Sequence, residues 1–458
     1  MLSSFRTTVT SSLTRRGLIR AGVATVGSLA LRPFGALPAL AQSAANYRAL
    51  VCVFLFGGND SNNTIVPMDD ASFQAYTSIR GSLALSAGDL TPTVNSVSNA
   101  PFAFHGKLAE VASLFSSKEL AVVANTGSLV QPLTRTQYQG SAAPVPLNLF
   151  SHSDQQLQWQ TSVAQGNSST GWAGRAVDYI SSQKINSSNF PAFLSVAGNA
   201  LEGQGAATQP VAIAPGQSLA LKAPGPAAAA TARMTALSSL LTTGNGLSLA
   251  QAANNIMANS IADAAALESA LAKAPAFKTQ FPKTSLGSQL QQVAEIIQAQ
   301  SKLGMSRQIF FCSLGGFDTH ASELETHNNI YPQLSQALAA FYSATEELGM
   351  ADSVTAFTES DFSRTFQPTT SDGSDHAWGS HHLVLGGAVK GGQIYGQFPQ
   401  FVLGGPNDAD TRGRWIPTTS IDQYGATLCS WFGIPNSALA TVFPNLANFG
   451  SQKLGFLG

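Results

Sequence analysis

Leu50-Val51-Cys52-Val53-Phe54-Leu55-Phe56, followed at once by Gly57-Gly58, is the stretch of sequence that decides the fold. Its apolar residues are continuous rather than alternating, which is typical of a strand buried on both faces in a parallel sheet. Similar runs recur at Leu120 to Ala124, Gln308 to Leu314 and Ser353 to Thr358. The sequence therefore predicts several strands of one buried sheet.

Helical patterns lie between these runs, for example at Leu108 to Phe115 and at Leu334 to Leu348. Strands that alternate with helices indicate a doubly wound α/β domain. We assign residues 46–458 to this domain.

One internal stretch, residues 203–280, differs in composition. It is rich in Ala, Ser, Gly and Gln and poor in aromatic residues, and Ala227 to Leu241 and Leu249 to Leu271 have helical composition. We interpret it as a helical insertion that forms a lid over one end of the sheet. The alternative is a partly disordered Ala-rich spacer.

The first 41 residues have the three parts of an export signal. They contain five arginines and no acidic residue, and an apolar run extends from Ala21 to Leu31. Ala39-Leu40-Ala41 then offers a small-x-small cleavage site. The pair Arg15-Arg16 indicates the twin-arginine pathway. The apolar run is well short of the ~20 residues that span a bilayer, so we expect no membrane span after cleavage. An uncleaved signal anchor is the alternative.

This leader predicts a partner, the twin-arginine export machinery, and a periplasmic or extracellular location. Five of the 24 basic residues lie in the leader, so the rest of the chain has an acidic excess of about six against 25 Asp and Glu. That balance argues against nucleic acid as a partner. Cys52, Cys312 and Cys429 are odd in number, so at least one is unpaired. We expect Cys52 and Cys312 to be buried thiols.

Carboxylates and imidazoles follow the predicted strands. In an open α/β sheet, ligands bind beyond the carboxyl ends of the strands, where such side chains converge. Converging groups of this kind need protons or cations between them, and oxygen and nitrogen ligands suit Zn²⁺, Mn²⁺ or Fe ions. With this many ligands, two metals fit better than one. The candidate ligands are Asp60, Asp318, His320, Glu359, Asp361, Asp375, His376, His381 and His382.

Some of these segments have plainer interpretations. Gly57 to Ser61 can be a strand-ending turn, and Asp318 can be a helix N-cap. The adjacent pair His381-His382 in a Gly/Ser loop favours a ligand role. His105 and His327 are interpreted as ordinary surface or helix histidines. The chain has no Walker loop and no Gly-x-Gly-x-x-Gly motif.

Seven segments together resemble the domain-of-unknown-function 1501 family. They are LVCVFLFGGNDSNNTIVP, NLFSHSDQQLQWQTS, GWAGRAVDYI, FFCSLGGFDTHASE, VTAFTESDFSRT, GSDHAWGSHHLVLGGAVKGGQIYG and RGRWIPTTSIDQYGATLCSWFGI. The resemblance runs from about Ala49 to Phe449 and breaks down in the Ala-rich insertion. The family is similar in fold to the alkaline phosphatase and sulfatase superfamily. The resemblance therefore implies an α/β/α sandwich with a mostly parallel central sheet and one or two metals at the strand ends.

The resemblance also assigns roles to residues. Asp60 matches the aspartate that ends the first strand. Ser151 or Ser153 matches the nucleophile at a helix start, with His152 as its rival, either as a metal ligand or as the base. Asp318 and His320 match a later metal-binding pair, although their spacing departs from Asp-x-x-x-His. A plainer role for either serine is to cap the helix.

The superfamily's Ser-Asp-His-Gly turn resembles the segment from Glu359 to Ser363. Asp361 matches its aspartate, but Phe362 stands in place of the histidine. Asp375-His376 then supplies the metal ligand that is missing at Phe362, and His381 or His382 is a further ligand from later in the chain.

The function implied is metal-dependent hydrolysis of a phosphate or sulfate ester, with one or two divalent ions such as zinc or manganese. The substrate would be a small anionic ester or a polysaccharide. Arg364 can hold the anionic group in a bidentate manner, or it can form a surface salt bridge. The alternative function is a non-catalytic periplasmic binding or assembly protein on the same fold, which the missing histidine at Phe362 favours.

Overall fold

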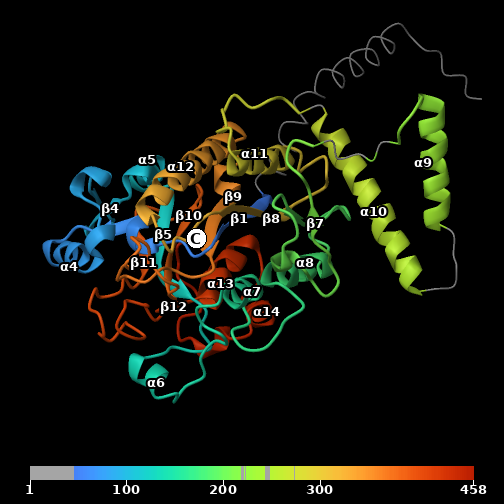
Figure 1. Ribbon diagram of the computed structural model, residues 1–458. Helices are drawn as coiled ribbons and strands as arrows, with labels where there is room; N and C mark the ends of the chain where they lie inside the picture. The colour runs from blue at the N-terminus through green and yellow to red at the C-terminus, as the bar shows by residue number, and fades with distance from the viewer. Residues whose placement is uncertain (1–45, 218–220, 222, 243–247, 273) are drawn as a thin grey trace, which may run out of the picture. The chain divides into compact units, whose positions relative to one another are not determined.

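The large sheet of the protein contains the predicted strands. In the computed structural model, which describes residues 46–458 except 218–220, 222, 243–247 and 273, the first strand β1 spans Arg48–Phe56. The other strands of this sheet are β5 (Leu120–Gly127), β6 (Phe193–Ser195), β7 (Val211–Ala212), β8 (Arg307–Gly315), β9 (Val354–Ser360), β10 (Ser380–Leu385), β11 (Ile394–Gly396) and β12 (Thr419–Ser420). Their order is β11-β5-β10-β9-β1-β8-β6-β7, with β12 also paired to β5 (Figure 1).

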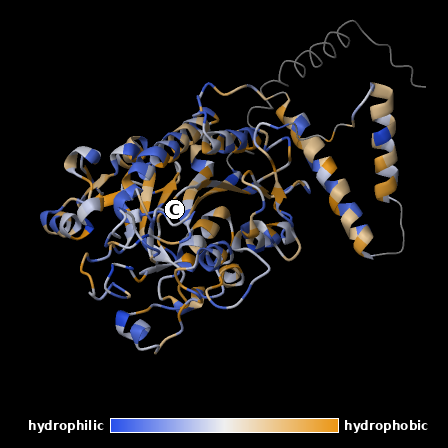
Figure 2. Ribbon diagram, viewed as in Figure 1, coloured by the Kyte–Doolittle hydropathy of each residue, from blue (hydrophilic) through white to orange (hydrophobic). Residues whose placement is uncertain are grey.

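Strand β1 lies between β8 and β9 and runs parallel to both. Every residue from Ala49 to Leu55 is buried, because both faces of the sheet are covered. Figure 2 shows the central strands largely in the hydrophobic colour. Only β10 among the described strands of this sheet is antiparallel to its neighbours, β5 and β9. The predicted mixed α/β fold with a mostly parallel central sheet is confirmed.

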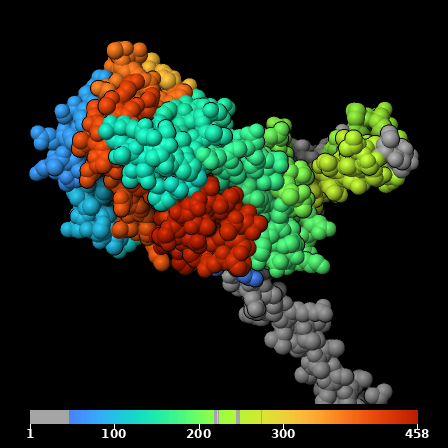
Figure 3. Space-filling model, turned by 90° about the horizontal axis from the view of Figure 1, so that it is seen from below, coloured from blue at the N-terminus to red at the C-terminus, as the bar shows by residue number. Residues whose placement is uncertain are grey.

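Helices cover the two faces of the sheet. On one side, α12 (Glu323–Glu347) packs against α5 (Ala109–Ser116) and α11 (Ser285–Gln298). On the other side, α14 (Asn436–Val442) packs against α8 (Trp172–Ser182) and α13 (Ile421–Phe432), and α7 (His152–Thr161) contacts α8. Figure 3 shows residues of this second layer, green and red, side by side on one face.

A smaller sheet lies beside the first loop of the large one. It is antiparallel, in the order β2 (Ile65–Pro67), β4 (Pro101–Phe104), β3 (Val94–Asn95). Between β1 and β2 the chain makes the short helix α3 (Ser61–Thr64), and α4 (Asp70–Arg80) follows. These elements place Arg80 beside Asp60, which follows the end of β1.

The Ala-rich insertion contains two helices, α9 (Ala227–Thr242) and α10 (Ser248–Leu271), at the positions that composition indicated. No described residue of α9 is buried, and α10 buries Leu267 and Ala270. The leader and its predicted boundary at residue 41 lie outside the described residues. No described helix combines the length and apolarity that a membrane crossing requires.

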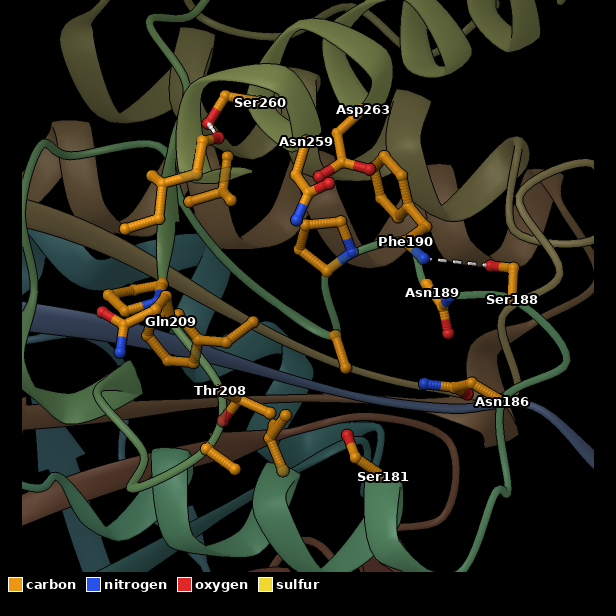
Figure 4. A pocket seen from close by; sticks show the side chains of 18 of the residues that line it. Ser181, Asn186, Ser188, Asn189, Phe190, Thr208, Gln209, Asn259, Ser260 and Asp263 are labelled. Atoms are coloured by element: carbon orange, nitrogen blue, oxygen red, sulfur yellow. Dashed lines mark hydrogen bonds between the residues drawn. The ribbon is translucent and has the colours of Figure 1, made fainter. Parts of the chain in front are cut away.

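A cavity of about 800 Å³ lies between α10 and the loops that lead to β6 and β7. Figure 4 shows polar side chains around it, among them Asn189, Asn259 and Asp263. The insertion therefore covers a sheet edge, where β6 and β7 pair, and this cavity contains none of the predicted site residues.

The three cysteines are free thiols and are buried, as expected for Cys52 and Cys312. The interpretation of His105 and His327 as ordinary surface or helix histidines is wrong about their exposure. His327 does lie in helix α12, but both residues are buried and pack against the ring of Tyr331. Their imidazoles fill core space that the sequence did not reveal.

His327 gives a prediction for the dependence of stability on pH. Burial lowers the pKa of His327 to about 4, from an ordinary value of 6.5 in the unfolded chain. Between pH 4 and pH 6.5 the imidazole of His327 is therefore protonated in the unfolded chain but neutral in the folded protein. Protonation thus favours the unfolded state, and the folded protein loses stability as the pH falls from 6.5 toward 4. His327→Phe keeps a ring against Tyr331 and removes the titration.

Between pH 7 and pH 4, urea denaturation should show wild type losing up to about 3 kcal/mol more unfolding free energy than His327→Phe. Nearby Asp60, whose pKa burial raises to about 6, titrates in both proteins and largely cancels in this difference. Parallel stability curves for the two proteins would contradict the prediction.

Candidate functional site

The loops after β1, β8 and β9 meet at one end of the sheet because the three strands are parallel and in register, with Phe56 opposite Gly315 and Leu55 opposite Ser360. Gly57 makes this approach possible. Its φ is +112°, and a Cβ there would lie 2.4 Å from the backbone nitrogen of Asp318. The Gly57 N–H donates to Oδ1 of Asp361 at 3.2 Å. A side chain at this position would therefore push the Asp318 loop away.

Three imidazoles converge on one carboxylate oxygen, Oδ1 of Asp318. The Nε2 atoms lie at 3.4 Å for His152, 3.1 Å for His320 and 3.5 Å for His376. The two Nε2 atoms of His320 and His376 are 2.9 Å apart. Helix α7, the loop after β8 and the loop before β10 thus contribute to one histidine–carboxylate centre, which we call the Asp318 centre.

The outer nitrogen of each imidazole faces an oxygen atom. Nδ1 of His152 donates to Oδ2 of Asp361 at 2.6 Å, and Nδ1 of His376 donates to the Phe150 carbonyl at 2.7 Å. Nδ1 of His320 lies 3.4 Å from Oδ1 of Asp375. Such outer contacts fix the ring orientation of metal-binding histidines, and here they direct every Nε2 atom toward the centre.

Charge at the centre is set by these neighbours. The hydrogen bond to Asp361 raises the pKa of His152, and burial lowers the pKa of His376. Partial burial would raise the pKa of Asp318, but the hydrogen bond and charge of Arg364 outweigh it and hold that pKa below its ordinary value. Asp318 is therefore ionised at neutral pH.

The donor set fits a divalent cation. One donor atom each from His152, Asp318 and His376 lies within 4.8 Å of the other two. Two nitrogens and one oxygen at such separations match the ligands of zinc and related ions, which bind imidazole and carboxylate together. Half of the Asp318 side chain is exposed, so a ligand can reach the centre.

Phe362 forms the apolar floor of the centre. Its buried ring stacks on His376 with centroids 4.8 Å apart, and it lies 4.8 Å from the ring of His152. The rings of His152 and His376 therefore both rest on Phe362.

Asp60 is not brought into the Asp318 centre, contrary to the expected common crevice. It is fully buried, and its Oδ2 pairs with Arg80 at 2.5 Å while Oδ1 accepts from the Asn62 amide at 2.8 Å. As N-cap of α3, it fits the turn interpretation of this segment. Arg80 offsets its charge and also pairs with Glu323, and Asp60, Glu323 and His327 form a donor group separate from the Asp318 centre.

His381 and His382 also lie away from the centre. They belong to strand β10 rather than to a loop, and their side chains have different neighbours. Nδ1 of His381 accepts from the Asn125 N–H at 2.9 Å, whereas the ring of His382 packs 4.6 Å from that of Trp159. Burial lowers the pKa of each to about 3. Glu359 is buried and belongs to a different donor group, with Cys52 and Glu202.

The serines lie at the start of α7, on either side of His152. Ser151 holds the N-cap position, yet its hydroxyl donates to Oδ2 of Asp154 at 2.5 Å and accepts no backbone N–H. Ser153 is exposed. The N-cap interpretation is thus right about the position of Ser151 and wrong about the hydrogen bond.

Arg364 is neither a surface ion pair nor an exposed anion binder. Its side chain is fully buried, and Nη2 donates to Oδ1 of Asp318 at 2.5 Å and to the Phe317 carbonyl at 3.2 Å. The guanidinium therefore supports Asp318 from inside the protein.

Two arginines that sequence reasoning did not single out lie at the rim of the centre. Arg412 pairs with Asp375 at 2.5 Å, and Nε of Arg414 donates to the His376 carbonyl at 2.7 Å. Their side chains are 33% and 23% exposed, so both can meet a ligand. The sequence signal that could have identified them is the segment Arg-Gly-Arg-Trp, which places two cationic residues in one of the motifs that carry the family resemblance.

Glu323 ties the loops of the centre together. Its Oε2 accepts from the hydroxyls of Thr319, at 2.9 Å, and of Ser374, while Oε1 pairs with Arg80 at 3.1 Å. Thr319 follows Asp318 and Ser374 precedes Asp375. This buried carboxylate therefore positions two segments of the centre without facing it.

The fold and the site define an α/β protein with a histidine–carboxylate centre at the carboxyl ends of parallel strands. The chain belongs to the family described as protein of unknown function (DUF1501), whose model matches residues 47–409. This confirms the family part of the resemblance. No curated protein matches the chain.

Solved structures match at low similarity. Ps i-CgsB is 7% identical over 87% of this chain and 77% of its own, with a TM-score of 0.35. Its complex with k-i-k-neocarrahexaose is 8% identical over 87% and 76%, with a TM-score of 0.33. A structure described under the metabolism of multiple glycosaminoglycans by Bacteroides thetaiotaomicron is 10% identical over 87% and 74%, with a TM-score of 0.34. Likeness of this degree does not define a function.

Proposed function

We propose that the protein is an exported, metal-dependent hydrolase of phosphate or sulfate esters, on a fold of the alkaline phosphatase type. The observation that supports this is the convergence of three imidazole nitrogens on Asp318, each held by an oxygen atom on its far side. His152, Asp318 and His376 would hold one divalent ion, zinc, manganese or a similar metal, with His320 at its exposed side.

When bound, such an ion polarises the ester oxygen and stabilises the negative charge that develops during displacement. The chain's own residues would do the rest. Asp361 and the Phe150 carbonyl keep two rings oriented, and Arg412 and Arg414 attract the anionic group from the rim. Of the two serines, Ser151 makes the shorter hydrogen bond to Asp154, a carboxylate that could accept its proton, and is our candidate for attack on the ester.

The test is made on the mature chain purified without chelator. We expect about one tightly bound divalent metal at the Asp318 centre, measured by elemental analysis as the difference between wild type and a His152→Ala, His376→Ala double variant. We also expect wild type, and not the double variant, to hydrolyse 4-nitrophenyl phosphate or 4-nitrophenyl sulfate. Equal metal content in the two proteins would overturn the proposal that the Asp318 centre binds a metal.

The second candidate function is a non-catalytic binding or assembly protein, favoured by Phe362 in the position of a histidine. It predicts the same metal difference between the two proteins but no turnover of either ester. Binding of a sulfated or phosphorylated oligosaccharide without hydrolysis, measured by calorimetry, would then support it.

Export gives a separate prediction. Arg15→Lys combined with Arg16→Lys should leave the precursor in the cytoplasm, because the pathway recognises the paired arginines. Cell fractionation with an antibody against the mature chain measures this, and Arg6→Lys, which leaves the pair intact, is the control. Normal accumulation of the double variant in the periplasm would refute the export proposal.

A further inference from the structure

A second group of metal-binding side chains lies inside the protein, separate from the Asp318 centre. Cys52 of β1, Glu359 of β9 and Glu202 of the turn Leu201–Gly203 each place one donor atom within 4.8 Å of the other two. All three residues are buried, with exposures of 0%, 1% and 0%. The turn that carries Glu202 contacts α7 and α8, so this group lies under the layer formed by those helices.

The carboxylates of this group lack charged partners. Both side-chain oxygens of Glu202 and Oε2 of Glu359 have no hydrogen bond in the described part of the chain. Neither carboxylate forms an ion pair with a described arginine or lysine, whereas buried Asp60 and Glu323 share Arg80. A buried carboxylate that stays ionised without a partner costs several kcal/mol, so each of these groups is neutralised either by a proton or by a cation.

An imidazole without partners lies on the same side of the sheet. Neither ring nitrogen of His382 has a hydrogen bond, and its ring packs 5.8 Å from that of Tyr424. Tyr424 donates its hydroxyl to the Thr358 carbonyl, next to Glu359. His382 and Glu359 come from β10 and β9, which are paired strands. A thiol, two carboxylates and a free imidazole are thus gathered in one buried region.

We propose that Cys52, Glu202 and Glu359 form a second, closed metal site that binds a zinc-like divalent cation, with His382 of the paired strand β10 as a candidate fourth donor. Thiolate, carboxylate and imidazole are the donors that zinc and related borderline ions accept, and closed sites of this type are structural. On binding, the thiol and any protonated carboxyl release their protons, and the cation offsets the remaining negative charge. The ion would join β1, β9 and the turn that supports α7 and α8.

Cobalt substitution tests this proposal, because the Asp318 centre contains no thiol. The full mature chain is freed of metal, reloaded with Co²⁺ and measured by absorption spectroscopy. We expect a thiolate-to-cobalt charge-transfer band in wild type and in the His152→Ala, His376→Ala double variant. The band should be absent from Cys52→Ala and retained in Cys312→Ala, a matched control in which a buried thiol of neighbouring β8 is removed.

Zinc content and thermal unfolding provide the second readout. Cys52→Ala and Glu202→Gln should each bind about one zinc fewer per chain than Cys312→Ala, and chelation should lower the melting temperature of the control but not of these variants. If wild type shows no charge-transfer band and Glu202→Gln unfolds at the same or a higher temperature with unchanged zinc, the carboxyls are simply protonated and the site is overturned. Failure of the ester assay would leave these readouts unaffected.

Discussion

Replacing Arg80 with methionine is expected to lower the free energy of unfolding by about 3–5 kcal/mol. Arg80 pairs with Asp60 at 2.5 Å and with Glu323 at 3.1 Å, and all three side chains are fully buried. Its Nη1 also donates to the carbonyls of Thr365 and Phe366 at 3.1 and 3.2 Å. Methionine fills most of the volume but leaves two buried carboxylates without a cation.

Chemical denaturation monitored by circular dichroism measures this loss. Arg233→Met, a change of an exposed arginine on α9, should alter stability by no more than about 0.5 kcal/mol. Adding Asp60→Asn and Glu323→Gln to Arg80→Met should recover much of the loss, because no uncompensated charge then remains. If Arg80→Met stays within about 1 kcal/mol of wild type, water must reach the triad and our account of it is wrong.

Asp318→Asn is expected to reduce ester hydrolysis by on the order of 1000-fold, equivalent to about 4 kcal/mol of transition-state stabilisation. The substitution preserves shape but removes the ionised oxygen on which three imidazoles converge. Asp361→Asn, which alters the partner of His152 and also an acceptor of the Gly57 N–H, should reduce metal affinity or turnover by about 10- to 100-fold. A graded response of this kind separates a ligand from the residue that orients a ligand.

Asp70→Asn, at the exposed start of α4, is the control and should keep wild-type turnover. Ser151→Ala and Ser153→Ala, assayed alongside, locate the nucleophile. Loss of turnover with retained metal in Ser151→Ala supports attack by its hydroxyl, whereas full activity of both variants assigns the attack to water. Unchanged turnover in a folded Asp318→Asn protein would exclude the Asp318 centre from catalysis.

The large sheet was predictable because four of its strands are continuous apolar runs with glycines or helices between them. Strand β10 was not. All six of its residues, from Ser380 to Leu385, are buried, yet two are histidines and the first is a serine. Adjacent polar residues in a Gly/Ser context indicate a loop, and only the neighbours Phe398, Trp159 and Tyr424 turn these histidines into core residues.

Asp60 and Asp318 illustrate the limit of sequence reasoning about the site. Both follow a Gly-Gly pair after a buried strand, so the local pattern gives them the same role. What separates them lies elsewhere in the sequence, because Arg80 of α4 pairs with Asp60, whereas His152 of α7 and His376 of the loop before β10 approach Asp318. Predicting this division requires the three-dimensional path of the chain. The resemblance to a family names His152 and His376 as candidates because it places whole segments rather than single residues.

The strand order also has a consequence for how the chain folds. Strands β1 and β5, the first two of the large sheet to be synthesised, pair only with strands from β8 onward, and Arg48 lies opposite Arg307. The two parallel parts of the sheet are joined by β10 alone. Loop closure over such separations is slow, and until it occurs the apolar edges of β1 and β5 are open to aggregation. A nascent chain that ends before Ser380 should therefore remain incompletely folded and depend on chaperones.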